Sequence, residues 1–290
     1  HCSLSSAARC SSNSRRRNRP INSNSLRKLG RLIRAWAMIR RMHSWSAWLA
    51  PARSWLLKQA NASQRRSLLD LGCGFGVISQ ELVKLSRGRV VALDHSLPAL
   101  LAAPSALRKS PPACADAACL PFADASFDLV FCQLALLWMP LEATLAEVSR
   151  VLQPGGVLVA IEPDYGGMIE HPPELATRDL WVDALRRAGA DPLVGRKLPG
   201  LLAGHGFEVQ VELMSKLTAP VPQRFDLLRG LPLTGYERKQ VDALKHRAGK
   251  MDAPWQQVVH LPFMLVTAQI KETPRRGRSM APWRRLTDGR

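Results

Sequence analysis

The sequence has no acidic residue before Asp70 and no apolar run of the roughly 20 residues that a membrane-spanning helix needs. Residues 1–69 hold 15 Lys or Arg against no Asp or Glu, and residues 271–290 hold seven against two. The remaining 70–270 are nearly balanced, with 19 basic and 21 acidic side chains, so the formal charge of +18 belongs to the two ends. We therefore expect neither a transmembrane anchor nor an ordinary secretory signal. The basic ends can still bind RNA, DNA or anionic lipid through electrostatic attraction alone.

Metal-binding and disulfide patterns are also missing. The six cysteines form no CxxC pair, and no histidine stands at ligand spacing from any of them, so no metal site is predicted. Free thiols in a reducing compartment predict a cytoplasmic protein. The Arg- and Ser-rich beginning is also typical of an organellar transit peptide, so organellar import is the alternative. The start at His1 leaves open whether residues 1–25 belong to the native protein.

Composition divides the chain into four parts. Residues 1–25, mostly Ser, Arg and Asn, predict a disordered basic leader. Residues 26–62 predict amphipathic helices, the first ending where Pro51 breaks the apolar period and the second running over about 52–60. We expect these helices to cover the mouth of the following domain, with binding to a membrane surface as the alternative. Residues 63–270 form the main domain, and 271–290 form a basic tail.

Short Val-, Leu- and Ile-rich runs alternate with helical stretches in the main domain. This alternation predicts an α/β fold of the Rossmann-like, doubly wound kind, with helices on both faces of a mostly parallel sheet. The expected strands cover 67–71, 89–94, 113–116, 127–133, 157–161, 207–214 and 260–269. The expected helices cover about 76–86, 97–108, 141–152, 174–188 and 195–204. Residues 163–173 are expected to be a connection, and 218–258 to be helical and irregular.

The densest local signal is the run Leu68-Leu69-Asp70-Leu71-Gly72-Cys73-Gly74-Phe75-Gly76. It reads as an apolar strand that enters a glycine-rich turn and then a helix. Glycines let the backbone approach the polar end of a ligand closely and supply unusual φ and ψ angles. The dinucleotide fingerprint GxGxxG needs a glycine at position 77, where this chain has Val77. The pattern is GxGxG preceded by an acid.

Two further acids follow predicted strands. Asp94 ends the run Val90-Val91-Ala92-Leu93-Asp94, 18 residues after Gly76, where an acid accepts hydrogen bonds from the two ribose hydroxyls of a nucleoside. Asp116 precedes Leu120-Pro121-Phe122, which predicts an acceptor near an exocyclic amine with apolar groups for a purine face. His95 is either part of the pocket wall or a plain loop residue.

Together with Phe127-Asp128-Leu129-Val130 and the run from Glu147 to Leu158, these ordered motifs resemble class I S-adenosylmethionine-dependent methyltransferases. The resemblance is to the type 11 group, which includes quinone C-methyltransferases and biotin-precursor O-methyltransferases, and it covers about residues 65–162. It implies a seven-stranded sheet whose last strand is antiparallel, in agreement with the strand count. By position it implies that S-adenosylmethionine is held by Asp70, Gly72, Cys73, Gly74, Gly76, Asp94, His95, Asp116, Ala117 and Gln133.

The resemblance implies direct displacement, in which an acceptor nucleophile attacks the sulfonium methyl group and neither a metal nor a covalent intermediate is required. Candidates for a general base follow the fifth strand: Tyr165, His171 and Asp164, with loop anchoring favoured for Asp164 and Glu162. Trp138, Tyr165 and Trp36 are expected to line the pocket of a small, apolar acceptor.

Two other functions stay open at this point. The basic termini suit a methyltransferase of nucleic acid such as RNA, but such an enzyme is expected to carry Asn/Asp-Pro-Pro-Tyr/Phe after the fourth strand, or paired catalytic cysteines. The chain has Phe131-Cys132-Gln133-Leu134 there. A non-catalytic protein that binds S-adenosylmethionine, or docks to a partner or peripherally to a membrane through its basic arm, is the other possibility. The sequence leaves the oligomeric state unknown.

Overall fold

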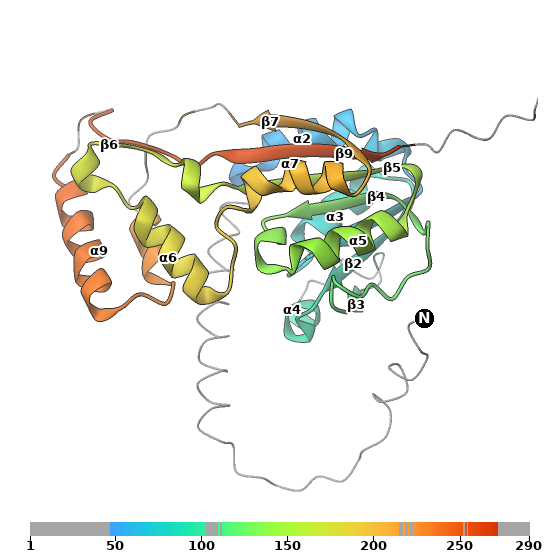
Figure 1. The fold of residues 1–290 in the computed structure, drawn as a ribbon, viewed down its shortest axis with the longest axis horizontal. Helices are drawn as coiled ribbons and strands as arrows, with labels where there is room; N and C mark the ends of the chain where they lie inside the picture. Colours follow the sequence, from blue (N-terminus) through green and yellow to red (C-terminus); the bar gives the residue numbers. More distant parts are fainter. Residues whose placement is uncertain are drawn as a thin grey trace, which may run out of the picture.

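A computed structural model describes residues 47–102, 110, 112–214, 217, 220, 223–251, 253 and 255–271. Its centre is a seven-stranded sheet with the order β3-β2-β1-β4-β5-β9-β7 (Figure 1). Strand β9 pairs antiparallel with both of its neighbours, and the other pairings are parallel. The predicted Rossmann-like sheet with an antiparallel last strand is therefore confirmed.

Long apolar runs produce the central strands because a parallel sheet is buried on both faces. The seven strands are β1 (Ser67–Leu71), β2 (Arg89–Asp94), β3 (Pro112–Cys114), β4 (Phe127–Gln133), β5 (Leu152–Pro163), β7 (Phe207–Leu213) and β9 (Phe263–Ile270). Strands β1, β2 and β4 have the predicted bounds. Strand β5 is longer than predicted because Leu152 already pairs with Phe127, ahead of a register shift. The edge strand β3 is shorter than predicted.

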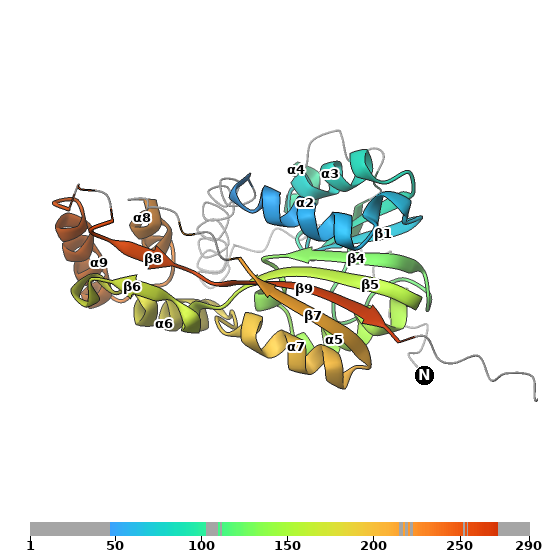
Figure 2. The same cartoon turned by 90° about the horizontal axis from the view of Figure 1, so that it is seen from above.

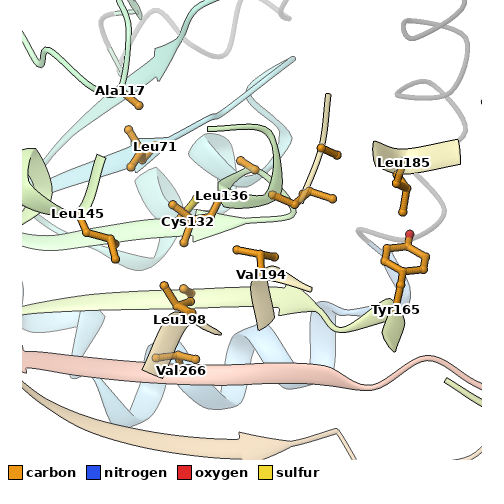
Figure 3. Packing of buried hydrophobic residues seen from close by; sticks show 14 of the residues in the cluster. Leu71, Ala117, Cys132, Leu136, Leu145, Tyr165, Leu185, Val194, Leu198 and Val266 are labelled. Atoms are coloured by element: carbon orange, nitrogen blue, oxygen red, sulfur yellow. The ribbon is translucent and has the colours of Figure 1, made fainter. Parts of the chain in front are cut away.

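Helices cover both faces of this sheet (Figure 2). One face carries α2 (Ala50–Gln59), α3 (Val77–Leu85) and α4 (Leu97–Ala102), and the other carries α5 (Leu141–Val151) and α7 (Val194–Gly204). Each face of the sheet has its own apolar cluster, and successive residues of a central strand belong to different clusters. Leu68 packs with Leu56 and Leu82 in the first cluster, and Leu69 belongs to the second, on the opposite face. Figure 3 shows part of the second cluster, with Leu145 and Leu198 on that face.

Helix α2 begins at Ala50, next to Pro51, where the first predicted helix was expected to end. Pro51 occupies the first turn of α2, a position that needs no backbone N–H. Leu49, Leu56 and Leu57 of this region are fully buried against the sheet, so α2 covers one of its faces. Residues 1–46, which include the predicted leader and most of the first helix, lie outside the described residues.

A side lobe stands at the carboxyl ends of β5 and β7, and three of its elements correct the sequence prediction. It comprises β6 (Ile169–His171), α6 (Arg178–Ala188), α8 (Gln223–Arg229), α9 (Gly235–Ala248) and β8 (Val258–His260). Strands β6 and β8 form an antiparallel pair where a connection and an irregular stretch were predicted. Helix α6 starts at Arg178 rather than 174, because Ala176 is extended and Thr177 is not helical.

Within the described residues, no helix is both long enough and apolar enough to cross a membrane.

Candidate functional site

The glycine-rich turn after β1 is fixed by hydrogen bonds to the end of β2. The N–H groups of Gly72 and Cys73 both donate to the carbonyl oxygen of Leu93, at 2.8 and 2.9 Å. Gly72, Gly74 and Gly76 have φ angles of 76°, 54° and 71°, a region that other residues enter only at a cost. We call residues 72–76 the donor loop. The sequence prediction of a strand, a glycine turn and a helix is confirmed here.

Gly72 has a second reason to be glycine. A Cβ atom at this position would lie 2.5 Å from the Cβ of Ala135 and 3.1 Å from the Cε of Met139. Both neighbours belong to the turn that follows β4, so the donor loop and that turn are in direct contact.

Asp94 joins the donor loop to the end of β2. One carboxylate oxygen accepts from the N–H of Gly74 and the other from the N–H of Ser96, both at 2.8 Å. Each oxygen keeps a further lone pair that can accept a ligand hydroxyl. Beside it, the side chain of His95 is 81% exposed, and its Nδ1 lies 3.4 Å from Asp94. The structure thus brings Asp94 and the donor loop together and leaves His95 at the rim.

Asp70 and Cys73 are two titratable residues at the start of the donor loop, and Cys73 is half-buried. Asp70 is buried, and the Ser79 hydroxyl of α3 donates to its carboxylate at 2.5 Å. Burial raises the pKa of Asp70 to about 7, although the Ser79 hydrogen bond acts in the opposite direction. Burial, with the charges of Asp70 and Asp94, raises the pKa of the Cys73 thiol. The Asp70 carboxylate thus links the end of β1 to α3, the two elements on either side of the donor loop.

Asp116, Ala117 and Gln133 follow the ends of β3 and β4. Cys114, the last residue of β3, is in register with Asp94, so the end of β3 lies beside Asp94, while the end of β4 lies on the other side of β1. Asp116 is exposed and accepts from the N–H of Ala118 at 2.9 Å, while Ala117 is buried. Gln133 is buried at the end of β4. This arrangement leaves the Asp116 carboxylate accessible at the rim.

Arg53 of α2 is a site residue that the sequence analysis missed. It is buried, and its Nη2 lies 2.6 Å from Glu81 Oε2 while its Nη1 donates to Gln133 Oε1 at 3.1 Å. Its charge acts on Asp70 and lowers the pKa of that carboxyl. A signal was present, since Arg53 falls four residues after Leu49 and three before Leu56, within the apolar stripe of α2. A charge in such a stripe has to find a buried partner.

The three predicted base candidates have different surroundings, although Asp164 and Tyr165 are adjacent in the chain. Tyr165 is buried, and its ring stacks on Trp181 at a centroid distance of 5.4 Å. Asp164 is buried, and both of its oxygens accept from Arg196 at 2.8–2.9 Å, in line with the anchoring role favoured for it. His171 is exposed on β6. Two of the three candidates are therefore already engaged in packing or ion pairing.

Of the predicted acceptor-lining residues, Trp138 is half-exposed in the short 3-10 helix η4 (Leu136–Trp138) that follows β4. Tyr165 belongs to the core, and Trp36 lies outside the described residues. In the part of the chain that the structure describes, no three His, Cys, Asp or Glu side chains gather in a way that could hold a metal ion.

Comparison with known proteins agrees with this geometry. A family model described as a methyltransferase domain matches residues 69–160. Malonyl-[acyl-carrier protein] O-methyltransferase from Pseudescherichia vulneris is 38% identical over 104 residues, which are 36% of this chain and 41% of that protein. The Coxiella burnetii enzyme 1 of the same name is 40% identical over 101 residues, 33% of this chain and 34% of its own. The chain thus spans about a third to two fifths of these relatives.

Solved structures agree at the level of the fold. The YcgJ protein from Bacillus subtilis matches with a TM-score of 0.56 and 16% identity, over 75% of this chain and 98% of that one. The [4+2]-cyclase SpnF matches with a TM-score of 0.52 and 19% identity, over 76% and 80% of the two chains. Residues 69–160 therefore match a methyltransferase domain by sequence, and the described part of the chain shares the fold of these solved structures.

Proposed function

We propose that this protein transfers a methyl group from S-adenosylmethionine to a small, apolar acceptor. The observation that carries the proposal is the bridge made by Asp94, which holds the Gly74 N–H at the end of β2 and keeps lone pairs free for ribose hydroxyls. The exposed carboxylate of Asp116 would accept from the adenine amine, and the donor loop would contact the methionine moiety. A cytoplasmic location belongs to the proposal and is supported by four free thiols among the described residues.

The chemistry is a direct displacement. S-adenosylmethionine supplies a methyl group on a sulfonium centre. A lone pair of the acceptor forms the new bond to the methyl carbon while the carbon–sulfur bond breaks, and its electrons stay on sulfur in S-adenosylhomocysteine. The proton of an acidic acceptor passes to water or to a base. The protein contributes position and exclusion of water rather than a covalent step.

The acceptor is the part of the proposal that the relatives support least. Their names describe methylation of a malonyl group on a carrier protein, but the matched segments cover about 100 residues. The methyltransferase family model ends at residue 160, before the side lobe begins. Since β5 and β7 both enter this lobe at their carboxyl ends, we propose that the lobe and Trp138 select the acceptor.

Donor binding is the first test. Calorimetric titration of S-adenosylmethionine and S-adenosylhomocysteine into the protein should give dissociation constants on the order of micromolar, as for ordinary enzyme substrates. A folded protein that binds neither ligand would overturn the proposal.

Replacing Trp138 with alanine should separate acceptor from donor. We expect methyl transfer to an apolar acceptor to fall by about tenfold or more, because a truncated aromatic contact costs on the order of 1–3 kcal/mol, while S-adenosylhomocysteine binding stays unchanged. Radiolabelled transfer over a panel of small acids, phenols and thioesters provides the measurement. Trp55→Ala is the matched control, since Trp55 is 38% exposed and Trp138 is 39% exposed. Loss of both activities in Trp138→Ala would contradict its place in the acceptor pocket.

Arg53→Ala should weaken donor binding by about tenfold or more, because a hydrogen bond to a charged group contributes roughly 1.5–3 kcal/mol. The guanidinium lies close to Asp70 and Gln133, where it can attract the carboxylate of the methionine moiety. Calorimetry with S-adenosylhomocysteine checks this prediction. Arg187→Ala, which breaks an ion pair with Glu237 in the side lobe, should leave the affinity unchanged. Equal losses in both variants would indicate a general effect on stability instead.

A further inference from the structure

Glu162, near the end of β5, is a fully buried carboxylate with only one oxygen engaged. Its Oε1 accepts from the backbone N–H groups of Ala135 and Leu136, both at 2.9 Å. Its Oε2 is buried and has no hydrogen-bond partner in the described part of the chain. Burying a carboxylate costs free energy, so a neutral side chain could anchor the loop at a smaller loss of stability. The position calls for a role that uses the charge.

The backbone that Glu162 holds is the turn of residues 134–139. This turn begins at Leu134, whose φ of 57° is costly for a branched apolar residue. Its far side is tied down where the Asp191 N–H donates to the Leu137 carbonyl oxygen at 2.7 Å. The turn carries Ala135, which occupies the space where a Gly72 side chain would lie, and Trp138, which faces solvent. The Glu162 carboxylate therefore holds, through its hydrogen bonds, the turn whose Ala135 lies against Gly72 of the donor loop.

We propose that Glu162 is a positioning residue whose ionised carboxylate holds the 134–139 turn against Gly72, so that donor affinity depends on the protonation of this buried group. The inference rests on the proposed function, because the ligand is S-adenosylmethionine or its product. Glu162 itself touches neither the ligand nor the reacting atoms in this account. It acts through Ala135.

The protonation state of Glu162 changes near neutral pH. Burial raises its pKa to about 7, against the effect of the Leu136 and Ala135 hydrogen bonds. A carboxylate accepts these N–H groups more strongly than a protonated acid does. If the ligand-bound shape needs the carboxylate, binding lowers the pKa of Glu162, and affinity falls as the pH drops through 7.

The groups around Glu162 do not change charge in the same range, with one exception. The Cys132 thiol of β4 and the Tyr165 phenol face it, and burial raises the pKa of both, so they stay neutral. Its register partner on β9 is the apolar Met264, and α7 contributes Arg196, paired with Asp164. The exception is Asp70 of β1, whose pKa is also raised to about 7. A variant of Glu162 is therefore needed to assign the effect.

The test is calorimetric titration of S-adenosylhomocysteine at pH values from about 6 to 8. This ligand lacks the sulfonium charge, so a direct attraction between Glu162 and the sulfonium is excluded. A one-unit fall in the pKa on binding predicts about a fivefold lower affinity at pH 6 than at pH 8 for the wild type. In Glu162→Gln the amide oxygen can still accept both N–H groups. Because an amide does not titrate in this range, the pH dependence that Glu162 causes should disappear. Affinity should then stay near the low-pH wild-type value.

Asp128→Asn is the matched control. Asp128 also accepts two backbone N–H groups, from Arg66 and Ser67, but at the opposite end of β4. We expect this variant to keep the wild-type pH profile. If Glu162→Gln does not fold, the wild type and Asp70→Asn are titrated at pH 7 in two buffers of different ionisation enthalpy, and release of a fraction of a proton that persists in Asp70→Asn assigns the release to Glu162.

The outcomes separate the two proposals. Binding by the wild type, with the same pH profile in Glu162→Gln, would overturn the role of Glu162 and leave the proposed function supported. The absence of proton release at pH 7 would also overturn that role. Absence of binding by the folded wild type at every pH would overturn both.

Discussion

Gly72→Ala is expected to abolish measurable binding of S-adenosylhomocysteine and to destabilise the fold. The new methyl group would overlap with Ala135 at 2.5 Å, at a φ of 76° that disfavours any side chain. The left-handed backbone costs about 1–2 kcal/mol and overpacking about 1–3 kcal/mol, so we expect a loss of roughly 2–5 kcal/mol in the free energy of unfolding. Calorimetry and thermal denaturation measure the two effects.

Two comparisons make this prediction specific. Gly206→Ala shares a positive φ of 83° but meets nothing within 4 Å, so it should lose only the backbone part and bind the ligand normally. Ala135→Gly, combined with Gly72→Ala, removes the overlap and should restore part of the stability and binding. A double variant no better than the single one would show that contact between the donor loop and the 134–139 turn is unimportant.

Asp94→Ala is expected to lower affinity for S-adenosylhomocysteine by at least about a hundredfold. The change removes the acceptor of the Gly74 and Ser96 N–H groups and both proposed ribose contacts, each worth roughly 1.5–3 kcal/mol when the acceptor is charged. Calorimetry checks the affinity. The 2′-deoxy analogue of the ligand gives a sharper measurement: it should bind the wild type more weakly than the parent ligand, and Asp94→Ala should no longer tell the two apart.

Asp128→Ala provides the control for Asp94. It also removes a carboxylate that accepts two backbone N–H groups, but far from the donor loop. Its affinity for S-adenosylhomocysteine should match that of the wild type. If Asp94→Ala still discriminated between the ligand and its 2′-deoxy analogue, the ribose assignment would be wrong.

The sequence predicted best the parts of the fold that depend on continuous burial. Strands β1, β2 and β4 lie inside a parallel sheet, so their apolar runs mark their ends. Strands β6 and β8 have three residues each and exist only because they pair with each other across 90 positions of sequence. No local pattern contains that information.

The same distinction applies to the candidate site. Gly72, Gly74 and Asp94 were found because their chemistry depends on positions close in sequence and on strand ends. Arg53 meets Gln133 from 80 residues away, and its signal was a single charge in an apolar stripe. The hydrogen bonds of Glu162 go to the backbone N–H groups of Ala135 and Leu136, which every residue except proline supplies. A contact to a backbone N–H group therefore cannot be recognised from the residue types at positions 135 and 136.

The side lobe is encoded by two separate insertions that leave the sheet at the same edge, one after β5 and one after β7. The donor loop is encoded by neither. Recombination or gene synthesis can therefore exchange the lobe with that of a related protein and leave unchanged the residues proposed to contact the nucleoside. Chimaeras joined at the end of β5 and the start of α7, and at the end of β7 and the start of β9, should inherit their acceptor preference from the inserted lobe and their donor affinity from this chain.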